Sequence, residues 1–435
     1  MDTIFALSSG SLPSGVAVVR VSGPRTRFAI ETLCGLLPEA RKASLRKLRS
    51  ASGPVLDEGL VIWFPGPASF TGEDCCEFQV HGGRAVISAL LRELGTMDGL
   101  RLAEPGEFSR RAFTNGRLDL TEIEGLADLV NAQTESQRRQ AQAQASGQLR
   151  VKLEGWRTRL VRMRALLEAD FDFADEEDVP GSVADGIWDQ ARALAAEIDA
   201  ALDDGRRGEI IRDGFQIVIL GPPNAGKSSL INALAKRDIA IVTSEAGTTR
   251  DLLEVHLDID GYAVTLVDTA GLRAAEGLVE REGIRRARER AATADLIVWL
   301  QPEGEHNDAS EQSFDGLETK RMIRFVSKDD NRRSRSGGIS VKRKDGLEPL
   351  LKAVRSALSE AVASEMPALV TRERHRAAMV NCRNHCLLAS EGDLLGTEIR
   401  GEYLRSASEE IARVTGRIDV DDLLDVIFGE FCIGK

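Results

Sequence analysis

The segment from Gly221 to Ser228 has the composition and spacing of a phosphate-binding loop. It reads Gly-Pro-Pro-Asn-Ala-Gly-Lys-Ser, which fits the pattern G-x-x-x-x-G-K-[ST]. Glycines in such a loop let backbone N–H groups close around phosphate oxygens, and the start of the following helix adds positive potential. We expect Lys227 to reach the β- and γ-phosphates and Ser228 to bind Mg²⁺. The loop residues predicted to contact a nucleoside triphosphate are Asn224, Ala225, Gly226, Lys227, Ser228 and Ser229.

Two further segments carry side chains that would complete such a site. Asp268 ends an apolar run and is expected to hold the Mg²⁺ shell, while the amide of Gly271 could sense the γ-phosphate. Thr249 is the preferred threonine to complete Mg²⁺ coordination in the triphosphate state, so its segment would become ordered by the γ-phosphate and relax on hydrolysis. The predicted nucleotide contacts in these segments are Thr243, Ser244, Glu245, Ala246, Gly247, Thr248, Thr249, Asp268, Thr269, Ala270 and Gly271.

The segment that would recognise the base departs from the usual pattern at one position. Lys328 and Asp330 fit Asn-Lys-x-Asp, in which the carboxylate pairs with guanine N–H groups, but Ser327 stands where the asparagine is expected. We predict GTP in preference to ATP, with a looser base site, because losing a neutral hydrogen bond typically costs about 0.5–1.5 kcal/mol. A Ser-Val-Lys segment stands in for the usual Ser-Ala-Lys. The predicted base-site residues are Lys328, Asp330, Ser340, Val341 and Lys342.

The machinery that orients the attacking water is predicted to differ from the Ras type. Leu272, rather than a glutamine, follows the Asp-Thr-Ala-Gly segment, and an apolar side chain cannot polarise water. The charged candidates nearby are Arg273, Glu276, Glu280 and Glu282.

The hydrophobic pattern indicates which elements must position these residues. Apolar runs at 215–220, 263–267 and 295–300 alternate with helical stretches, which is typical of a mostly parallel sheet built from βαβ units. The regions on either side are helical in period. One predicted helix face carries Leu149, Leu153, Trp156, Leu160, Met163 and Leu167, and an earlier one carries Leu120, Ile123, Leu126, Ala127 and Val130. The stretch Gln133 to Gln148 is also predicted to be helical, because it is rich in Gln and Ala.

The N-terminal region is predicted to be of mixed α/β type. It has strand-like runs at 15–21 and 59–64, and a helix after Gly83 with Val86, Leu90, Leu91 and Leu94 on one face. The predicted fold class is therefore multidomain α/β plus α: an N-terminal α+β domain, a discontinuous helical domain, and an inserted P-loop domain of the Ras-like G type. The expected domain ranges are 1–117, 118–210, 211–355 and 356–435.

Length and composition exclude several classes of protein. A chain of 435 residues suggests roughly three domains, and a 42% hydrophobic share lets each bury a core. The net charge of −12 argues against a globally basic nucleic-acid binder but not against a local basic patch. The six cysteines match neither a zinc ribbon nor a disulfide framework. No apolar run approaches the length of a membrane span and no signal peptide is evident, so the cytoplasm is the expected location.

Taken together, these motifs resemble the MnmE (also called TrmE) family of bacterial tRNA-modification GTPases, which belongs to a wider TrmE-Era-EngA-like group. The resemblance covers nearly the whole chain, and the Cys-Ile-Gly-Lys ending is its most specific motif. The other matching segments are Asp2-Thr3-Ile4, Val19 to Pro24, Phe70 to Asp74, His81-Gly82-Gly83, Pro105 to Ser109, Arg111-Ala112-Phe113, Leu118-Asp119-Leu120 and Ala127-Asp128-Leu129.

The resemblance implies that the N-terminal domain is folate-binding-like, forms a homodimer, and binds 5-formyl- or 5,10-methylene-tetrahydrofolate as a one-carbon donor. By position, the folate-site residues would be Arg20, Glu77, Arg117 and Lys435. Arg117 stands where the family usually has lysine, and the stretch 8–14 also departs from the family pattern. Without the resemblance, an ion pair between strands would be the preferred interpretation of Arg20 and Glu77.

The family's GTPases are activated by K⁺ and by dimerisation of their G domains. The resemblance implies that Asn224 binds K⁺ and that Glu280 orients water or acts as an indirect general base. A solvent-facing helix residue is the alternative for Glu280. The other residues implied at the K⁺ site are Thr243, Glu245 and Thr248.

The family acts with MnmG, an FAD-containing partner, in a heterotetramer or larger complex. Together they add an aminomethyl-type group to C5 of the tRNA wobble uridine. Cys432 is a candidate reactive thiol if a cation such as Lys435 stabilises its thiolate, and a small packing residue is an equally good interpretation. Basic clusters at 41–49 and 281–290 could touch tRNA phosphates, although solvated surfaces are the more usual explanation. The competing function is a regulatory GTP switch, for example in ribosome assembly, without one-carbon chemistry.

Overall fold

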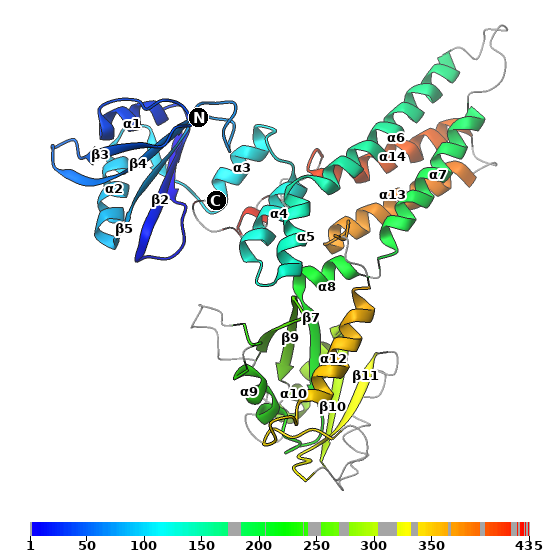
Figure 1. The fold of residues 1–435 in the computed structure, drawn as a ribbon. Helices are drawn as coiled ribbons and strands as arrows, with labels where there is room; N and C mark the ends of the chain where they lie inside the picture. The colour runs from blue at the N-terminus through cyan, green and yellow to red at the C-terminus, as the bar shows by residue number, and fades with distance from the viewer. Residues whose placement is uncertain are drawn as a thin grey trace. The chain divides into compact units, whose positions relative to one another are not determined.

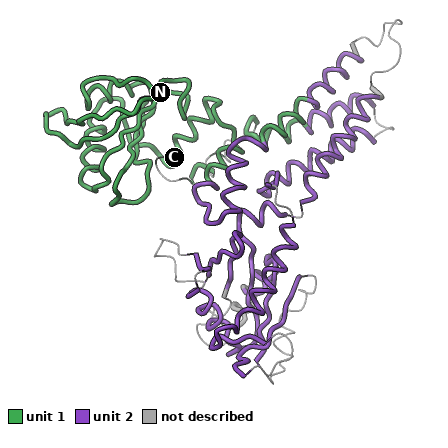
Figure 2. Tube along the Cα trace, viewed as in Figure 1, with its two compact units in different colours: residues 1–127, 150–158, 408–435 green, residues 128–149, 159–407 purple. Residues whose placement is uncertain are grey.

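A computed structural model shows how these segments fold. It describes residues 2–172, 184–204, 206–237, 239–241, 254–268, 278–302, 320–331, 338–363, 367–391, 396–418, 424, 427–429, 431 and 434. The chain divides into two compact units (Figure 2). The first unit comprises residues 1–127, 150–158 and 408–435, and the second comprises residues 128–149 and 159–407.

The first unit is built on a six-stranded sheet with strand order β3-β4-β5-β2-β1-β6 (Figure 1). Neighbouring strands are antiparallel except β1 and β6, which are parallel. The strands are β1 (Thr3–Leu7), β2 (Ser14–Ser22), β3 (Ser44–Arg49), β4 (Val55–Phe64), β5 (Cys75–Gly82) and β6 (Leu100–Leu102). The strands predicted at 15–21 and 59–64 are thus confirmed.

Two helices, α1 (Thr26–Cys34) and α2 (Arg84–Thr96), cover one face of this sheet and form its core with residues such as Val19 and Phe78. The helix predicted after Gly83 is confirmed, although Ile87 is buried in its core while Val86 and Leu91 are only partly buried. Side chains alternate along β2, so Ala17, Val19 and Val21 are buried against the helices. Arg20 therefore projects from the opposite face of the sheet.

A second, smaller core in this unit joins the C-terminal residues to the helices that follow the sheet. Helix α3 (Glu107–Thr114) and the first turns of α4 (Leu120–Asn131) pack against Phe428 and Phe431. Gly106 has a φ of +67°, and a Cβ there would lie 2.6 Å from the Phe428 carbonyl oxygen. Only glycine therefore permits this close approach.

The helical part of the second unit is assembled from sequence-distant halves. Arg400 stacks its guanidinium 3.7 Å from the centroid of the Trp188 ring and donates to the carbonyl oxygens of Ala389 and Ser390. These contacts join three helices, one that precedes the α/β segment in sequence and two that follow it (Figure 1). The helices are α5 (Glu135–Ala145), α6 (Gln148–Asp172), α7 (Ala184–Leu202), α8 (Arg207–Asp213), α13 (Glu373–Glu391) and α14 (Thr397–Thr415). Residues 150–158 of α6 and 408–415 of α14 are counted with the first unit.

The predicted face of α6 is confirmed, because each of its apolar residues is at most 2% exposed. One further helix prediction is confirmed and one is wrong. The stretch from Gln133 to Gln148 is helical over α5, which Thr134 caps, and Gly147, with a φ of +83°, separates α5 from α6. Val130 does not share the buried face of α4 and is 47% exposed.

The inserted part of the second unit is a five-stranded sheet with strand order β11-β10-β7-β9-β8. Its strands are parallel except β8, an antiparallel edge strand that the hydrophobic pattern did not predict. Its polar and apolar residues alternate, so it contains no continuous apolar run of the kind that marked the other strands. The strands are β7 (Phe215–Leu220), β8 (Glu254–Ile259), β9 (Tyr262–Asp268), β10 (Leu296–Pro302) and β11 (Met322–Ser327), and the helices are α9 (Lys227–Ala235), α10 (Leu278–Thr293) and α12 (Glu348–Ala361).

The central strand β7 buries both of its faces. Ile217 and Ile219 pack on one side and Val218 and Leu220 on the other, as expected for parallel strands covered by helices. In this arrangement the carboxyl ends of β7, β9, β10 and β11 share one edge of the sheet, and the loops after them are brought together. Within the described ranges, no helix is long and apolar enough to cross a membrane, and no group of three metal-ligating side chains is found.

Candidate functional site

The phosphate-binding loop lies where its pattern requires, between the end of β7 and the start of α9. Gly221 has a φ of +144°, and a Cβ there would lie 2.2 Å from the Leu300 carbonyl oxygen, so glycine allows the loop to pass close to β10. Gly226, with a φ of +91°, is the N-cap of α9. Asn224 is exposed and has a φ of +61°, a conformation in which non-glycine residues are often found at functional sites.

The ammonium group of Lys227 is held over this loop. Its Nζ donates to the carbonyl oxygen of Gly221 at 2.7 Å and to that of Pro222 at 2.9 Å. Ser228 follows as the second residue of α9. A cationic side chain beside the N-terminal amides of a helix is an arrangement that binds anions such as phosphate.

The backbone of Asp268 is placed beside the same loop. As the last residue of β9 it is the cross-strand partner of Ile219, two residues before Gly221. Hydroxyl and carboxylate oxygens are ligands that suit Mg²⁺. Ser228 lies in the first turn of α9, which follows β7, and Asp268 ends the neighbouring strand β9. The donor set therefore fits the ion, and the roles of the two residues remain predictions.

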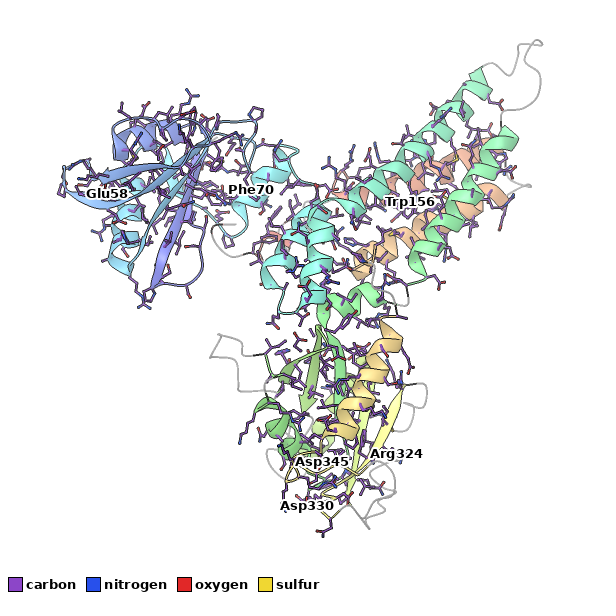
Figure 3. All side chains as sticks on the ribbon, viewed as in Figure 1. Glu58, Phe70, Trp156, Arg324, Asp330 and Asp345 are labelled. Atoms are coloured by element: carbon purple, nitrogen blue, oxygen red, sulfur yellow. The ribbon has the colours of Figure 1, made fainter. Side chains whose placement is uncertain are left out.

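A pocket between the start of α9 and the loop after β11 brings the phosphate-loop and base-motif residues together. Figure 3 marks Asp330 at this end of the sheet. Leu230, Leu300 and Ile339 supply apolar walls that sequence reasoning missed, because apolar residues at strand ends carry no motif. The full lining is Ala225, Gly226, Ser229, Leu230, Leu300, Ser327, Lys328, Asp330, Ile339, Val341 and Lys342.

The carboxylate of Asp330 has two partners in this pocket. Lys342 donates from Nζ to Oδ2 at 2.8 Å, and Ser340 donates from Oγ to Oδ1 at 2.6 Å. The hydrogen bond from Lys342, followed by that from Ser340, holds the pKa of Asp330 below its ordinary value. Asp330 is thus a charged acceptor for N–H donors at neutral pH. The Ser340 side chain is buried, and this hydrogen bond is its contact with the carboxylate of the pocket.

The two loops of the base site are held side by side by backbone hydrogen bonds. Asp329 donates its N–H to Ile339 O at 3.0 Å, and Ile339 donates to Val326 O at 2.8 Å. Lys328 has a φ of +60°, which turns the chain between β11 and Asp330. Ser327 is only 4% exposed, and in the described structure its hydroxyl has no hydrogen-bond partner although the residue lines the pocket.

In the first unit, Arg20 and Glu77 are cross-strand partners on β2 and β5. Arg20 donates to Glu77 Oε1 from Nη2 at 2.8 Å and from Nε at 3.2 Å. Its guanidinium also lies 5.1 Å from the Phe70 ring centroid and 5.7 Å from that of Phe108. The ion pair expected from the strands alone is therefore present, and the folate role remains a prediction. Arg117 is exposed beside Gly72 and does not contact this pair in the described structure.

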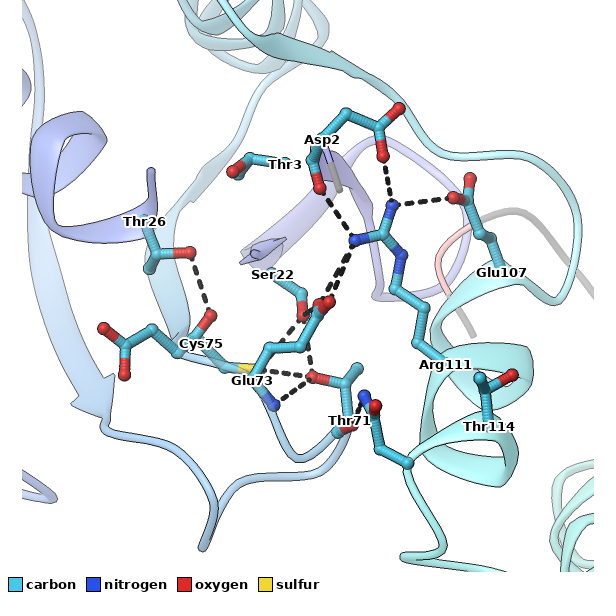
Figure 4. A network of polar contacts seen from close by, with 12 residues as sticks. Asp2, Thr3, Ser22, Thr26, Thr71, Glu73, Cys75, Glu107, Arg111 and Thr114 are labelled. Carbon is cyan, nitrogen blue, oxygen red and sulfur yellow. Dashed lines mark hydrogen bonds and ion pairs between the residues drawn. The ribbon is translucent and has the colours of Figure 1, made fainter. Parts of the chain in front are cut away.

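Arg111 is the centre of a polar network that sequence reasoning did not assign (Figure 4). It donates to Asp2 Oδ1 at 2.8 Å, to Glu107 Oε1 at 2.9 Å and to Glu73 Oε2 at 3.2 Å. Burial alone would raise the pKa of Glu107, but hydrogen bonds from Arg101, from the Glu104 amide and from Arg111 outweigh it and lower that pKa. The only sequence signal was that three of the matching family segments contain Asp2, Glu73 and Glu107.

The C-terminal tail lies against the start of the chain. A Cβ on Gly434 would lie 2.1 Å from the Leu7 carbonyl oxygen, and Gly434 has a φ of +102°. Phe431 packs in the core beside α3 and α4. Cys432 and Lys435 themselves are outside the described residues.

Several predicted site residues cannot be assigned a position. Glu280 lies in α10, but the side chains of Glu280 and Asp268 are not described. The predicted residues outside the described ranges are Thr243, Ser244, Glu245, Ala246, Gly247, Thr248, Thr249, Thr269, Ala270, Gly271, Arg273, Cys432 and Lys435.

Comparisons with known proteins cover the whole chain. Residues 3–117 match the family model described as GTP-binding protein TrmE N-terminus, and residues 120–432 match the model described as MnmE helical domain. The chain is 52% identical over 439 residues to a Rhizobium meliloti protein named tRNA modification GTPase MnmE, covering 100% of this chain and 99% of that protein. Proteins of the same name from Sinorhizobium medicae and Agrobacterium fabrum are 51% and 50% identical, with 100% of this chain and 99% of each relative covered. The chain belongs to the MnmE (TrmE) family of tRNA modification GTPases.

Proposed function

We propose that this protein is a GTP hydrolase that takes part in tRNA modification, at C5 of the wobble uridine. The observation that carries the proposal is the pocket in which the phosphate loop and the base-motif residues Lys328 and Asp330 meet. The full-length match to relatives named tRNA modification GTPase supports the tRNA part.

In this proposal each residue has a stated task. Lys227 neutralises phosphate charge, and Asp330 accepts hydrogen bonds from the guanine N–H groups. Ser228 and Thr249 bind Mg²⁺, and Asp268 acts on it indirectly, through groups bound to the ion. When bound, the ion neutralises charge on the β- and γ-phosphate oxygens. Glu280, with Arg273, orients the attacking water. Asn224, whose exposed position at the loop apex supports the assignment, binds K⁺ with Thr243, Glu245 and Thr248.

The N-terminal domain would bind a tetrahydrofolate one-carbon donor through Arg20, Glu77, Arg117 and Lys435. Two observations support this part of the proposal. The Arg20 guanidinium is held by Glu77 beside two aromatic rings, on the sheet face that α1 and α2 leave free. The packing of Gly434 against Leu7 brings the end of the chain to the same unit. Cys432 would then be available there as a thiol.

The proposed assembly is a homodimer that acts with an MnmG-type FAD protein and tRNA in the cytoplasm. The flavin chemistry would belong to that partner. The proposed domain ranges are 1–117 for dimerisation and folate binding, 211–355 for the G domain, and 118–210 with 356–435 for the helical domain.

GTP hydrolysis by the full chain in K⁺ and in Na⁺ at equal ionic strength tests this proposal, with Asn224→Ala and Lys227→Ala as variants. We expect strong stimulation by K⁺ that Asn224→Ala removes, and loss of hydrolysis in both salts for Lys227→Ala. Equal rates in the two salts would remove the K⁺ part, and ATP turnover as fast as GTP turnover would contradict the guanine assignment. If GTP is hydrolysed in neither salt, the proposal that the protein is a GTP hydrolase is contradicted.

A further inference from the structure

Segment 41–49 differs from most of the described structure in how its basic residues are paired, because four of its five basic side chains lack an acidic partner. Arg376 and Arg383, for example, are held by carboxylates at 2.9 Å and 2.6 Å. Segment 41–49 instead carries a run of basic residues on and before β3. In the described part of the chain, Arg41, Arg46, Lys47 and Arg49 have no carboxylate partner, and only Lys42 pairs with an acid, Glu39, at 2.9 Å.

The contacts that these side chains do make leave their charge uncompensated. Arg46 donates to the Leu45 carbonyl oxygen at 3.0 Å, Arg49 donates to that of Gly53 at 3.3 Å, and Arg41 donates to that of Ala68. All three acceptors are neutral backbone oxygens. The strand therefore presents a local excess of positive charge in a chain whose net charge is −12.

The position of β3 makes this charge accessible. It is the edge strand of the six-stranded sheet, and Arg41, Lys47 and Arg49 are exposed. Lys47 and Arg49 project from the same face, roughly 7 Å apart along the strand, together with the 60% exposed Leu45. Glu58, the cross-strand partner of Lys47, is the acidic residue nearest in register, and it does not form an ion pair with Lys47 in the described structure.

We propose that Arg41 and strand β3 form an RNA-contact surface that binds backbone phosphates of tRNA. This inference rests on the proposed function in tRNA modification. An acidic protein is repelled by a polyanion over most of its surface, so contact requires a place where cations are gathered without internal partners. Phosphate contacts of this kind position the RNA without reading its sequence.

Another explanation for basic residues on an edge strand is protection against pairing with other strands. That role predicts aggregation when the charges are removed, with no effect on RNA binding by the remaining soluble protein. The RNA-contact proposal predicts a change in the salt dependence of binding. The two explanations therefore differ in a measurable quantity.

The test measures how tightly the full chain binds an unmodified tRNA transcript that has a wobble uridine. Fluorescence anisotropy gives the binding constant at each of a series of KCl concentrations. The variant, called the β3 variant, is Arg41→Gln/Lys47→Gln/Arg49→Gln, which changes the three exposed basic residues of the surface. The matched control is Arg138→Gln/Arg139→Gln/Arg192→Gln, which removes the same charge from exposed arginines that pair with Glu135 and Asp189. GTP hydrolysis without RNA and the oligomeric state by light scattering show whether each variant is intact.

We expect the β3 variant to bind tRNA at least about tenfold more weakly. The slope of log K against log [salt] should become less steep by about 2 to 3, since each lost phosphate contact accounts for about 0.7–0.9. The control is expected to bind like the unchanged protein. Equal losses in the two variants would assign the effect to overall charge and overturn the proposal. Normal tRNA binding by the β3 variant, with loss of association to the FAD partner protein, would assign the surface to a protein instead.

The outcome also separates this inference from the function on which it rests. An unchanged protein that binds no tRNA at any salt concentration would contradict the tRNA part of the proposed function. If the unchanged protein binds tRNA in a salt-dependent way and the β3 variant binds equally well, only the proposed contact surface is overturned. If the triple variant aggregates, the single change Arg49→Gln replaces it, and a slope unchanged by that substitution also counts against the proposal.

Discussion

The network around Arg111 and the contacts of Asp330 use the same chemistry in different surroundings. Arg111, Glu73 and Glu107 have side chains that are 13%, 13% and 11% exposed. The Lys342 and Asp330 side chains are 77% and 32% exposed. The first cluster joins Asp2 just before β1, Glu73 just before β5, and α3 in one unit, whereas the second joins two loops beside a pocket.

The difference in exposure between the two clusters indicates that they have different roles, one structural and one in binding. Charges that are withdrawn from water depend on their partners, since removal of one partner leaves the others unpaired. Exposed charges exchange partners with solvent at little cost, so Asp330 can release Lys342 and accept the N–H groups of a bound base. The Arg111 network thus holds a unit together, and the Asp330 contacts keep a binding site ready for its ligand.

The substitution Arg111→Met would test this comparison with the largest expected effect. It would remove the cation that Glu73 and Glu107 share, and we expect a loss of about 3–5 kcal/mol in the free energy of unfolding. Urea unfolding followed by circular dichroism measures it. Lys342→Met is the matched change in the exposed cluster and is expected to leave the urea midpoint nearly unchanged. Similar midpoints for the two variants would contradict the comparison.

Acid titration would sharpen the same contrast with an intermediate effect. The pKa of Glu107 is lower in the folded protein than its ordinary value of 4.5, and hydrogen bonding to Arg101 likewise lowers the pKa of Asp2 below 3.8. Both groups bind fewer protons when folded, so their stabilisation is present above these ordinary values and is lost as pH falls through the folded pKa. Urea midpoints measured between pH 3 and pH 7 should fall less steeply below pH 4.5 for Glu107→Gln than for the unchanged protein. Parallel curves would show that Glu107 is not stabilised as an anion.

The smallest expected effect concerns the wall of the pocket. The buried Ser327 hydroxyl has no partner in the described structure, so an asparagine there would add a hydrogen-bonding amide to the base site. We expect Ser327→Asn to tighten GTP binding by about 0.5–1.5 kcal/mol, or roughly 2- to 12-fold. Titration calorimetry measures the change.

Two controls accompany that measurement. Ser327→Ala removes a hydroxyl that contributes no hydrogen bond, so GTP affinity should stay the same. ATP binding should not improve in Ser327→Asn. An equal gain for ATP and GTP would show that the substitution acts on pocket shape rather than on guanine recognition.

Local patterns predicted much of the fold because local rules control those parts. The phosphate loop lies between β7 and α9 as expected, and the α6 face from Leu149 to Leu167 is buried. Strand β8 was not predicted because the other strands were recognised as continuous apolar runs, whereas its polar and apolar residues alternate. The composition of 133–148 predicted helix but not where α5 ends, since Gly147, with its positive φ, separates α5 from α6.

By itself, the sequence determined the motifs, the alternation of strands and helices, and the family of this protein. Motif spacing and hydrophobic period are properties of neighbouring residues, so they are visible before folding. Only the tertiary structure decided which distant residues meet: Asp2 with Arg111, Asp330 with Lys342, and Gly434 with Leu7. It also decided that the cations of β3 stay without carboxylate partners in the described chain, because pairing depends on which strands and helices pack side by side.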